Sequence, residues 1–150
     1  MYFRGITYAT VLKAAKKLVY DANFILPEDV TASLRTTAEH VDRREKRIMN
    51  MILENADIAR TEELPICQDT GVGIFFVELG SSVLIENGTL HDALNEAVRS
   101  VYTEYCLRAS VVKSPLQRIN TGDNTPVIIH YTMVQGDALT ISFLPKGAGS

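Results

Sequence analysis

The chain has 150 residues, of which 46% are hydrophobic and 22% are charged, values typical of a globular domain of ordinary size. Its formal net charge of −3 gives no electrostatic reason to expect nucleic acid as a partner. No apolar run approaches the roughly 18 residues of a membrane helix, and the start MYFRGITYAT lacks the apolar core of a signal peptide. We therefore expect no membrane span and a cytoplasmic protein.

The first 60 residues are predicted to be helical. Apolar residues recur at helical spacing from Val11 to Val19, with Thr7 as the N-cap of this first helix. A second helix opens near Pro27, and a third carries the apolar stripe from Ile48 to Ala59. The pattern leaves open whether these two form one long helix or separate near Asp42.

Strand signals dominate the second part of the sequence. Val72 to Leu79 is a predicted strand, and Thr89 caps a fourth helix that begins at Leu90. Val127 to Val134 and Leu139 to Leu144 then form a predicted antiparallel hairpin around a Gln-Gly-Asp turn. The expected fold class is α+β rather than a βαβ series: an N-terminal helical region, about 1–60, and a small mixed sheet containing an antiparallel hairpin within 62–150.

Three polar loops are placed where a rigid scaffold can present chemistry: 65–71, 118–126 and 146–150. The last of them ends the chain in FLPKGAGS, directly after a predicted strand. Gly-rich segments in that position commonly lead into a helix N-terminus that holds an anion. We therefore expect the 150 residues to be the N-terminal part of a longer functional unit.

Cys67 stands in the first loop beside Gln68, Asp69 and Thr70. A cysteine is most often a small buried hydrophobe, but these polar neighbours are costly to bury unpaired. A metal ligand or a nucleophile is therefore favoured. Neither neighbouring loop offers a histidine base, and no second cysteine lies at zinc-site spacing; a cluster iron with its other thiolates from elsewhere remains possible. Cys106, on the predicted fourth helix, is interpreted as structural.

Three further features have two interpretations each. The triplet DTG at Asp69 is also the signature of aspartic proteases, but those enzymes need two carboxylates and this chain has a single DTG. Arg108, placed at the end of the fourth helix, suits either the helix dipole or a carboxylate clamp. The segment NTGDNTP, 120–126, is either a turn-rich loop held by its own Asn and Asp side chains or a segment that shapes a site.

Four segments together resemble the class I fumarate hydratases, a family that includes the α subunit of L(+)-tartrate dehydratase. They are LPICQDTG (64–71), LRASVV (107–112), PLQRINTGDNTPVIIHY (115–131) and LPKGAGS (144–150), in the order and rough spacing of that family. The resemblance covers the whole chain and is strongest from about residue 60 onward.

The resemblance implies an oxygen-sensitive 4Fe-4S cluster, held by cysteines and acting as a Lewis acid at an open iron. Cys67 matches one of its three ligands, and the other two are expected beyond Ser150. It further implies that Asp69 lies against the substrate and assists proton transfer, with Gln68 beside the open iron. Arg108 would clamp a substrate carboxylate, and Gly147 would offer a backbone N–H donor.

The expected activity is therefore the reversible hydration of a small dicarboxylic acid, with fumarate and L-malate as the first choice. Tartrate dehydration by an α subunit, or a non-catalytic scaffold domain, are the alternatives. The expected partners are a C-terminal domain or a β subunit, which would supply the general base, in a homodimer or an α/β assembly. The 150 residues alone are expected to be inactive.

Overall fold

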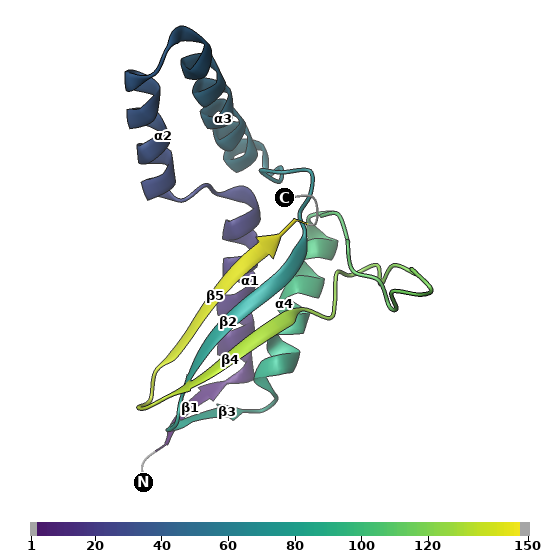
Figure 1. The fold of residues 1–150 in the computed structure, drawn as a ribbon. Coiled ribbons are helices and arrows are strands. Elements are labelled where there is room, and N and C mark those ends of the chain that lie inside the picture. The colour runs from purple at the N-terminus through teal and green to yellow at the C-terminus, as the bar shows by residue number, and fades with distance from the viewer. Residues whose placement is uncertain (1–2, 148–150) are drawn as a thin grey trace. The chain divides into compact units, whose positions relative to one another are not determined.

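The computed structural model describes residues 3–147, which form two compact units. One unit, the sheet unit, combines the first 20 residues with those from Asp69 onward, and the other, the helical hairpin, comprises Asp21–Gln68. After a short first strand, three helices precede the strands of a small mixed sheet, which confirms the α+β fold class. Figure 1 shows the order of the elements along the chain.

The main sheet of the sheet unit has three strands: β2 (Val72–Gly80), β4 (Ile128–Val134) and β5 (Leu139–Lys146). Their order is β4-β2-β5, with β2 parallel to β4 and antiparallel to β5. The parallel pair is connected through β3 and α4, so the α+β fold contains one βαβ crossover that the sequence analysis did not anticipate.

The predicted pairing of β4 with β5 as a hairpin is wrong, although both strands and the turn between them exist. β2 lies between β4 and β5 in the sheet (Figure 1). Backbone N–H groups at the C-terminal end of β2 donate to carbonyl groups at the turn that connects β4 to β5. Gly80 N donates to Ala138 O and Ser81 N to Val134 O, each at 2.8 Å. A turn signal in the sequence predicts that the chain reverses its direction. It does not exclude that a third strand lies between the two strands that the turn connects.

Two short strands were missed by the sequence analysis. β1 (Arg4–Thr7) and β3 (Val83–Glu86) form a separate two-stranded parallel sheet, with Arg4 opposite Val83. Each has only four residues, which is too short for the alternation of apolar and polar side chains to become visible.

Helices α1 (Tyr8–Phe24) and α4 (Leu90–Glu104) begin where the sequence predicts. The hydroxyl of Thr7 accepts a hydrogen bond from Thr10 N at 3.2 Å, and that of Thr89 accepts one from Asp92 N at 3.0 Å. These bonds satisfy amide groups that the first turn of a helix leaves without a partner.

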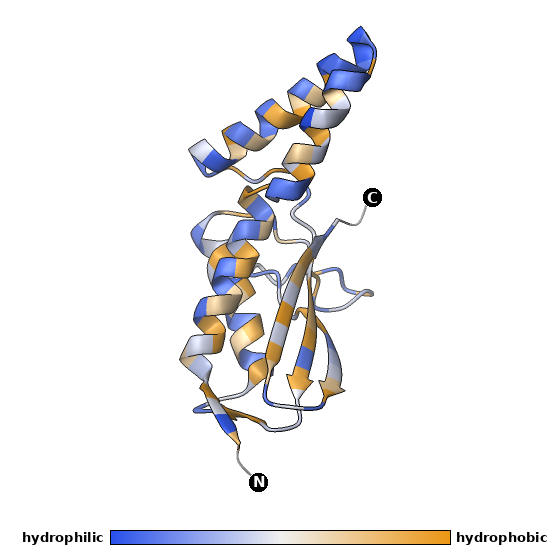
Figure 2. Ribbon diagram, turned by 90° about the vertical axis from the view of Figure 1, so that its left-hand side faces the viewer, coloured by the Kyte–Doolittle hydropathy of each residue, from blue (hydrophilic) through white to orange (hydrophobic). Residues whose placement is uncertain are grey.

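The core of the sheet unit lies between these two helices and one face of the sheet (Figure 2). Its fully buried side chains come from all three elements: Val11, Ala15, Val19, Phe75, Val77, Leu94, Ala97 and Val98. Phe75 packs on Phe143 of the neighbouring strand with ring centroids 4.8 Å apart. Apolar burial of this extent is the main stabilising contribution to the unit.

The helical hairpin contains the end of α1 and two complete helices, α2 (Glu28–His40) and α3 (Arg43–Glu62). Val41 and Asp42 are extended between them, so the segment forms two helices rather than one. Pro27 precedes α2 in the position where a missing amide hydrogen costs little. α3 ends at Glu62, and its C-cap residue Glu63 adopts a left-handed conformation and donates its backbone N–H to Ala59 O.

Among residues 3–147, no helix combines the length and the apolar character needed to cross a membrane.

Candidate functional site

The polar loops of the sheet unit meet at one end of the main sheet. The antiparallel register places Val72, the first residue of β2, opposite Lys146, the last residue of β5. The parallel register places Ile74 opposite Ile128, the first residue of β4. The residues before β2, after β5 and before β4 therefore gather at the same sheet end, which α4 also approaches with its C-terminus (Figure 1).

Gly71 fixes the closest approach within this cluster of loops. Its φ of +65° is a left-handed conformation that side chains disfavour. A Cβ atom added here would lie 2.3 Å from the carbonyl carbon of Lys146 and 2.6 Å from the amide nitrogen of Gly147. Only glycine allows the backbone of the first loop to lie directly against the end of β5.

Asn124 joins two of the loops through its side chain. It is fully buried, with a φ of +60° that asparagine tolerates better than most residues. Its amide nitrogen donates to Gly71 O at 3.0 Å, and its amide oxygen accepts from Ser110 N at 2.8 Å. The Asn124 side chain thus provides the hydrogen-bond partner for one backbone carbonyl and one backbone N–H group, from two different segments of the chain.

Thr70 makes a second connection between the first loop and the segment after α4. Its hydroxyl, on a residue that is 3% exposed, donates to Arg108 O at 2.9 Å. The Tyr102 hydroxyl of α4 donates to Thr70 O at 2.5 Å. Both bonds hold backbone rather than side chains, so they set the position from which Asp69 and Arg108 extend.

Asp69 itself is half-buried at the start of this arrangement. One of its carboxylate oxygens accepts a hydrogen bond from Gly71 N at 3.1 Å, which closes a turn of the kind that aspartate commonly forms. This bond restricts the orientation of the carboxylate.

Asp123 and Arg99 connect the second loop to α4. Arg99 Nε lies 2.9 Å from one Asp123 oxygen, and the other oxygen accepts from the backbone N–H and the hydroxyl of Thr125. Burial raises the pKa of Asp123, but these hydrogen bonds and the Arg99 charge outweigh it and lower the pKa to about 2. The carboxylate is therefore ionised throughout the neutral range.

The first interpretation of the segment 120–126, a turn-rich loop held by its own Asn and Asp side chains, is confirmed, and a role in shaping a site stays a prediction. Asn120 and Asp123 bond backbone N–H groups two residues further on, as a self-supporting turn does. Asn124 contacts two other segments at the same time. The sequence signalled the segment, whereas the roles of Thr70, Tyr102 and Asn124 depend on partners 14 to 53 residues away.

Two expectations about the end of α4 are wrong. Arg108 lies beyond the helix, which ends at Glu104, so the helix dipole does not account for it. Its side chain is exposed and forms no ion pair within residues 3–147. Cys106 is also outside the helix and exposed, with a φ of +53°, and is not a buried structural cysteine. The chain leaves the helix earlier than the apolar periodicity suggests.

The structure brings three of the predicted site residues into one cluster. Asp69 and Arg108 are connected through Thr70, and Gly147 lies against Gly71. Cys67 and Gln68, both exposed, are the last two residues of the helical hairpin and directly precede Asp69 in the chain.

The cysteines were tested against the needs of an iron–sulfur cluster, which is held by several thiolates. Cys67 and Cys106 are both exposed and are not linked by a disulfide. Residues 3–147 contain no group of three or more His, Cys, Asp or Glu side chains that could hold a metal ion. Cys67 is thus accessible enough to serve as one ligand, and a complete ligand set is not present in this part of the chain.

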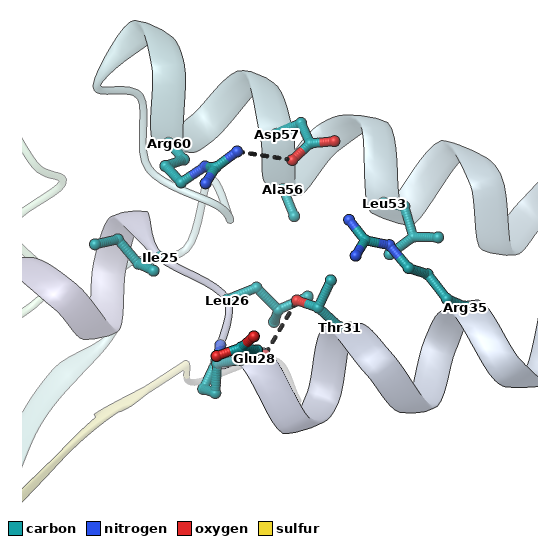
Figure 3. A pocket seen from close by; sticks show the side chains of 10 residues that line it. Ile25, Leu26, Glu28, Thr31, Arg35, Leu53, Ala56, Asp57 and Arg60 are labelled. Atoms are coloured by element: carbon teal, nitrogen blue, oxygen red, sulfur yellow. Dashed lines mark hydrogen bonds and ion pairs between the residues drawn. The ribbon is translucent and has the colours of Figure 1, made fainter.

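A separate hollow of about 420 Å³ lies in the helical hairpin, between the start of α2 and the second half of α3 (Figure 3). Arg60 and Asp57 on α3 are 3.4 Å apart at its edge, and Thr31 donates to Pro27 O at 3.0 Å. Glu28 and Arg35 add one charge of each sign. None of the predicted site residues lines it, and its mixed charge selects no class of ligand.

Comparison with known proteins adds independent information. The family model described as Fumarate hydratase (Fumerase) matches residues 12–150. A protein of Methanocaldococcus jannaschii named "Putative L(+)-tartrate dehydratase subunit alpha" is 34% identical over 141 residues, which are 89% of this chain and 49% of that protein. The aerobic class I fumarate hydratase of Escherichia coli K12 is 34% identical over 143 residues, 91% of this chain and 25% of that enzyme.

An L(+)-tartrate dehydratase subunit alpha of Escherichia coli UTI89 is 30% identical over 129 residues, 83% of this chain and 42% of that subunit. The chain therefore spans about half the length of the tartrate dehydratase subunits that it matches, and about a quarter of the fumarate hydratase. The family model covers nearly all of the sequence, and the relatives that the chain matches are named as fumarate hydratases or as subunits of L(+)-tartrate dehydratase. The chain belongs to the fumarate hydratase (Fumerase) family.

Proposed function

We propose that this chain contributes part of the active site of a hydro-lyase that interconverts fumarate and L-malate. The observation that carries the proposal is the convergence of the segments around Asp69, Arg108 and Gly147 at one end of the main sheet, in a chain of this family. A half-buried carboxylate, an exposed guanidinium and a glycine backbone are the groups that binding and dehydrating a dicarboxylic acid would require.

The reaction has two difficult parts. In the dehydration direction, a proton leaves the carbon next to one carboxylate, and hydroxide leaves the neighbouring carbon to form the double bond. Negative charge develops on the carboxylate beside the first carbon, where cations and oriented N–H groups can stabilise it. The hydroxide is a poor leaving group and needs an acid to accept it.

Arg108 is the proposed clamp for a substrate carboxylate. A guanidinium offers paired donors that match a carboxylate, and the exposed Arg108 side chain has no ion-pair partner among residues 3–147. Thr70 holds the Arg108 backbone at a fixed distance from the start of β2. Gly147, adjoining Gly71, is proposed to add a backbone N–H donor toward the same anion.

Asp69 is proposed to orient the substrate and to assist proton transfer. The hydrogen bond from Gly71 N restrains the carboxylate, so it would meet the substrate in a defined orientation. Gln68, directly before Asp69, is proposed as a further substrate contact.

Cys67 is proposed to hold one iron of a 4Fe-4S cluster, since its thiol is exposed and unlinked. When bound, such a cluster supplies a Lewis acid for the departing hydroxyl group. The remaining thiolates are proposed to come from outside this chain segment, because residues 3–147 contain no complete ligand group.

The rest of the enzyme is proposed to be a C-terminal domain or a β subunit, which would also contribute the general base. This proposal is supported by the share of the relatives that the chain covers and by the word "subunit" in two of their names. The 150 residues are then the N-terminal part of the functional unit, inactive alone, in a homodimer or an α/β assembly. Two unlinked cysteines fit the reducing cytoplasm, the proposed compartment.

Cys67→Ser tests the cluster proposal in the complete enzyme, reconstituted with iron and sulfide without oxygen. We expect loss of the visible absorption of the cluster, while the matched variant Cys106→Ser, at the other exposed cysteine, keeps it. An unchanged spectrum in Cys67→Ser would refute the ligand assignment.

Arg108→Ala and Asp69→Asn test the proposed roles through steady-state kinetics with L-malate. Loss of a carboxylate clamp should raise KM by about tenfold or more, whereas loss of assistance to proton transfer should lower kcat by about 100-fold. Arg118→Ala, at another exposed arginine of the loops, is the control and should change neither constant. Near-normal turnover in Asp69→Asn would exclude its chemical role.

L(+)-tartrate is the second candidate substrate, favoured by the names of two relatives that match most of this chain. Tartrate differs from malate by one additional hydroxyl group, so the same clamp and proton-transfer groups could serve both. Comparing kcat/KM for L-malate and L(+)-tartrate distinguishes the two, and turnover of neither by the complete enzyme would favour the non-catalytic alternative.

A further inference from the structure

Helix α3 exposes a row of apolar side chains that the hairpin does not use. Ile48, Met51 and Ile58 are 49%, 59% and 41% exposed. The opposite side of the helix is covered, with Met49 and Leu53 half-buried and Ala56 buried. Hydrophobic and hydrophilic positions alternate along the helices of the hairpin in Figure 2. A helix with a second apolar row, beyond the one it buries, is suited to a second helix.

The spacing of this row is that of a coiled-coil seam. Six exposed positions of α3 follow one another at alternating steps of four and three residues: Arg44, Ile48, Met51, Asn55, Ile58 and Glu62. Alternation of this kind keeps a row on one side of a helix that pairs with a neighbour along its length. The apolar members occupy the middle, and the two ends carry opposite charges.

The charges of α3 decide the direction of a partner of the same sequence. Its first turns are basic, with Arg43, Arg44, Lys46 and Arg47 against Glu45. Its last turns are acidic, with Glu54, Asp57 and Glu62 against Arg60. A parallel pair would place like charges together, whereas an antiparallel pair places the basic end of each helix beside the acidic end of the other.

We propose that α3 pairs antiparallel with α3 of a second copy of this chain, burying the row 44–62 between them. In the register that aligns the two rows, Arg44 meets Glu62 of the second copy and Ile48 meets its Ile58. Met51 meets its Asn55, and a polar residue within a seam favours one defined register. The Asn55 side chain already has a hydrogen-bond partner within its own copy, because its amide nitrogen donates to Ile66 O at 3.0 Å.

The proposed contact is isologous, as the interface of a two-fold dimer must be, and every contact in it occurs twice. It does not depend on the proposed activity, because it uses residues of the hairpin only.

Arg44 and Glu62 give a direct test of the register. They are 18 residues apart on one helix, hence about 27 Å apart along its axis at 1.5 Å per residue, too far to contact each other within one copy. Reversing either charge alone should raise the dimer Kd by about tenfold, because both symmetric contacts become repulsive. The double variant Arg44→Glu/Glu62→Arg should return the Kd to within about threefold of the original, since both contacts are restored with inverted sign.

The measurement is sedimentation equilibrium of the 150-residue chain from about 1 to 500 μM, with circular dichroism to verify folding. We expect a monomer–dimer equilibrium, and Met51→Glu should raise its Kd by about 100-fold because it buries a charge in the seam. Asn50→Glu, which places the same charge at an exposed position outside the row, is the control and should leave the Kd unchanged.

Three results would overturn the proposal. They are a monomer at every concentration, an unchanged Kd in folded Met51→Glu, and no recovery in the double charge reversal. The first would also be the result expected if another segment or protein covers this row instead of a second copy.

Discussion

The two units of the chain differ in how they are stabilised. The sheet unit buries large side chains from two helices and a sheet, including Phe75, Leu94 and Tyr102. The hairpin buries Phe24 and otherwise mainly alanines, at positions 38, 56 and 59, and leaves isoleucines and a methionine exposed. Because stability follows the apolar area removed from water, the sheet unit carries most of it.

The candidate site cluster lies in the unit whose backbone is fixed by buried contacts, which suits groups that must hold a substrate in one geometry. The hairpin, with little core of its own, is the unit that gains most from an external partner. The following variants test this contrast, from the largest expected change in the free energy of unfolding to the smallest.

Gly71→Ala should have the largest effect, because its Cβ would lie within 2.6 Å of backbone atoms of Lys146 and Gly147. Together with the left-handed φ, this should lower the free energy of unfolding by about 4 kcal/mol, measured by urea denaturation. Gly122→Ala is the control: its φ is +82°, but no atom lies within 4 Å of the added Cβ. It should cost about 1 kcal/mol, and equal costs at both sites would show that the close approach is unimportant.

Asn124→Ala should lower the free energy of unfolding by about 3 kcal/mol, because it removes the partners of Gly71 O and Ser110 N within a buried site. Asn87→Ala provides the control, since Asn87 has a similar φ of +62° but is exposed. The same urea titrations apply. If the two substitutions cost the same, backbone conformation rather than the two hydrogen bonds would explain the effect.

Val98→Ala and Val30→Ala compare the units with one chemical change. Val98 of α4 is fully buried, whereas Val30 of α2 is 40% exposed. Val98→Ala should lower the free energy of unfolding by about 2 kcal/mol, because the smaller side chain leaves a cavity in the core. Val30→Ala should change the free energy of unfolding by no more than about 0.5 kcal/mol. Little buried area is lost at this exposed position, and alanine has a higher helix propensity than valine. Thermal and urea unfolding of both variants measure the difference, and a comparable loss in Val30→Ala would mean that the hairpin depends on packing as the sheet unit does.

Apart from the control variants, Asp123→Asn should have the smallest effect, lowering the free energy of unfolding by about 1 kcal/mol at pH 7 after allowance for the partial exposure of Arg99. The folded-state pKa of about 2 lies below the ordinary 3.8, so the ionised carboxylate stabilises the fold above about pH 4. That contribution is lost as the pH falls toward 2, where the wild type and the variant should become equally stable. Urea titrations at several pH values between 2 and 7 measure this, and a difference independent of pH would contradict the assignment.

The helices were predictable because the information that specifies them is local. The periodicity of apolar residues and the caps Thr7 and Thr89 identified α1 and α4, and the structure confirms both capping bonds. The break near Asp42 stayed open, because no proline or glycine marks it. The strands β1 and β3 were missed, since four residues do not establish an alternating pattern.

The candidate site was predictable only as separate segments. Residue types pointed to the loops around Asp69, Arg108 and Gly147, and the resemblance to the family gave them roles that stay predictions. Arg108 was misplaced at a helix end, because apolar periodicity continues to Tyr105 although the helix ends one residue earlier. The connections made by Thr70 and Asn124 carry no local signal, since their partners are distant in the sequence.

The sequence by itself determined the family, the helices, the three longer strands and the polar segments between them. Each of these depends on neighbouring residues or on motifs that can be read along the chain. The tertiary structure alone decided that β2 lies between β4 and β5, and hence that the loops before β2 and β4 and after β5 meet at one end of the sheet. Strand pairing is a contact between residues far apart in the chain, and turn and strand signals are compatible with several orders of pairing.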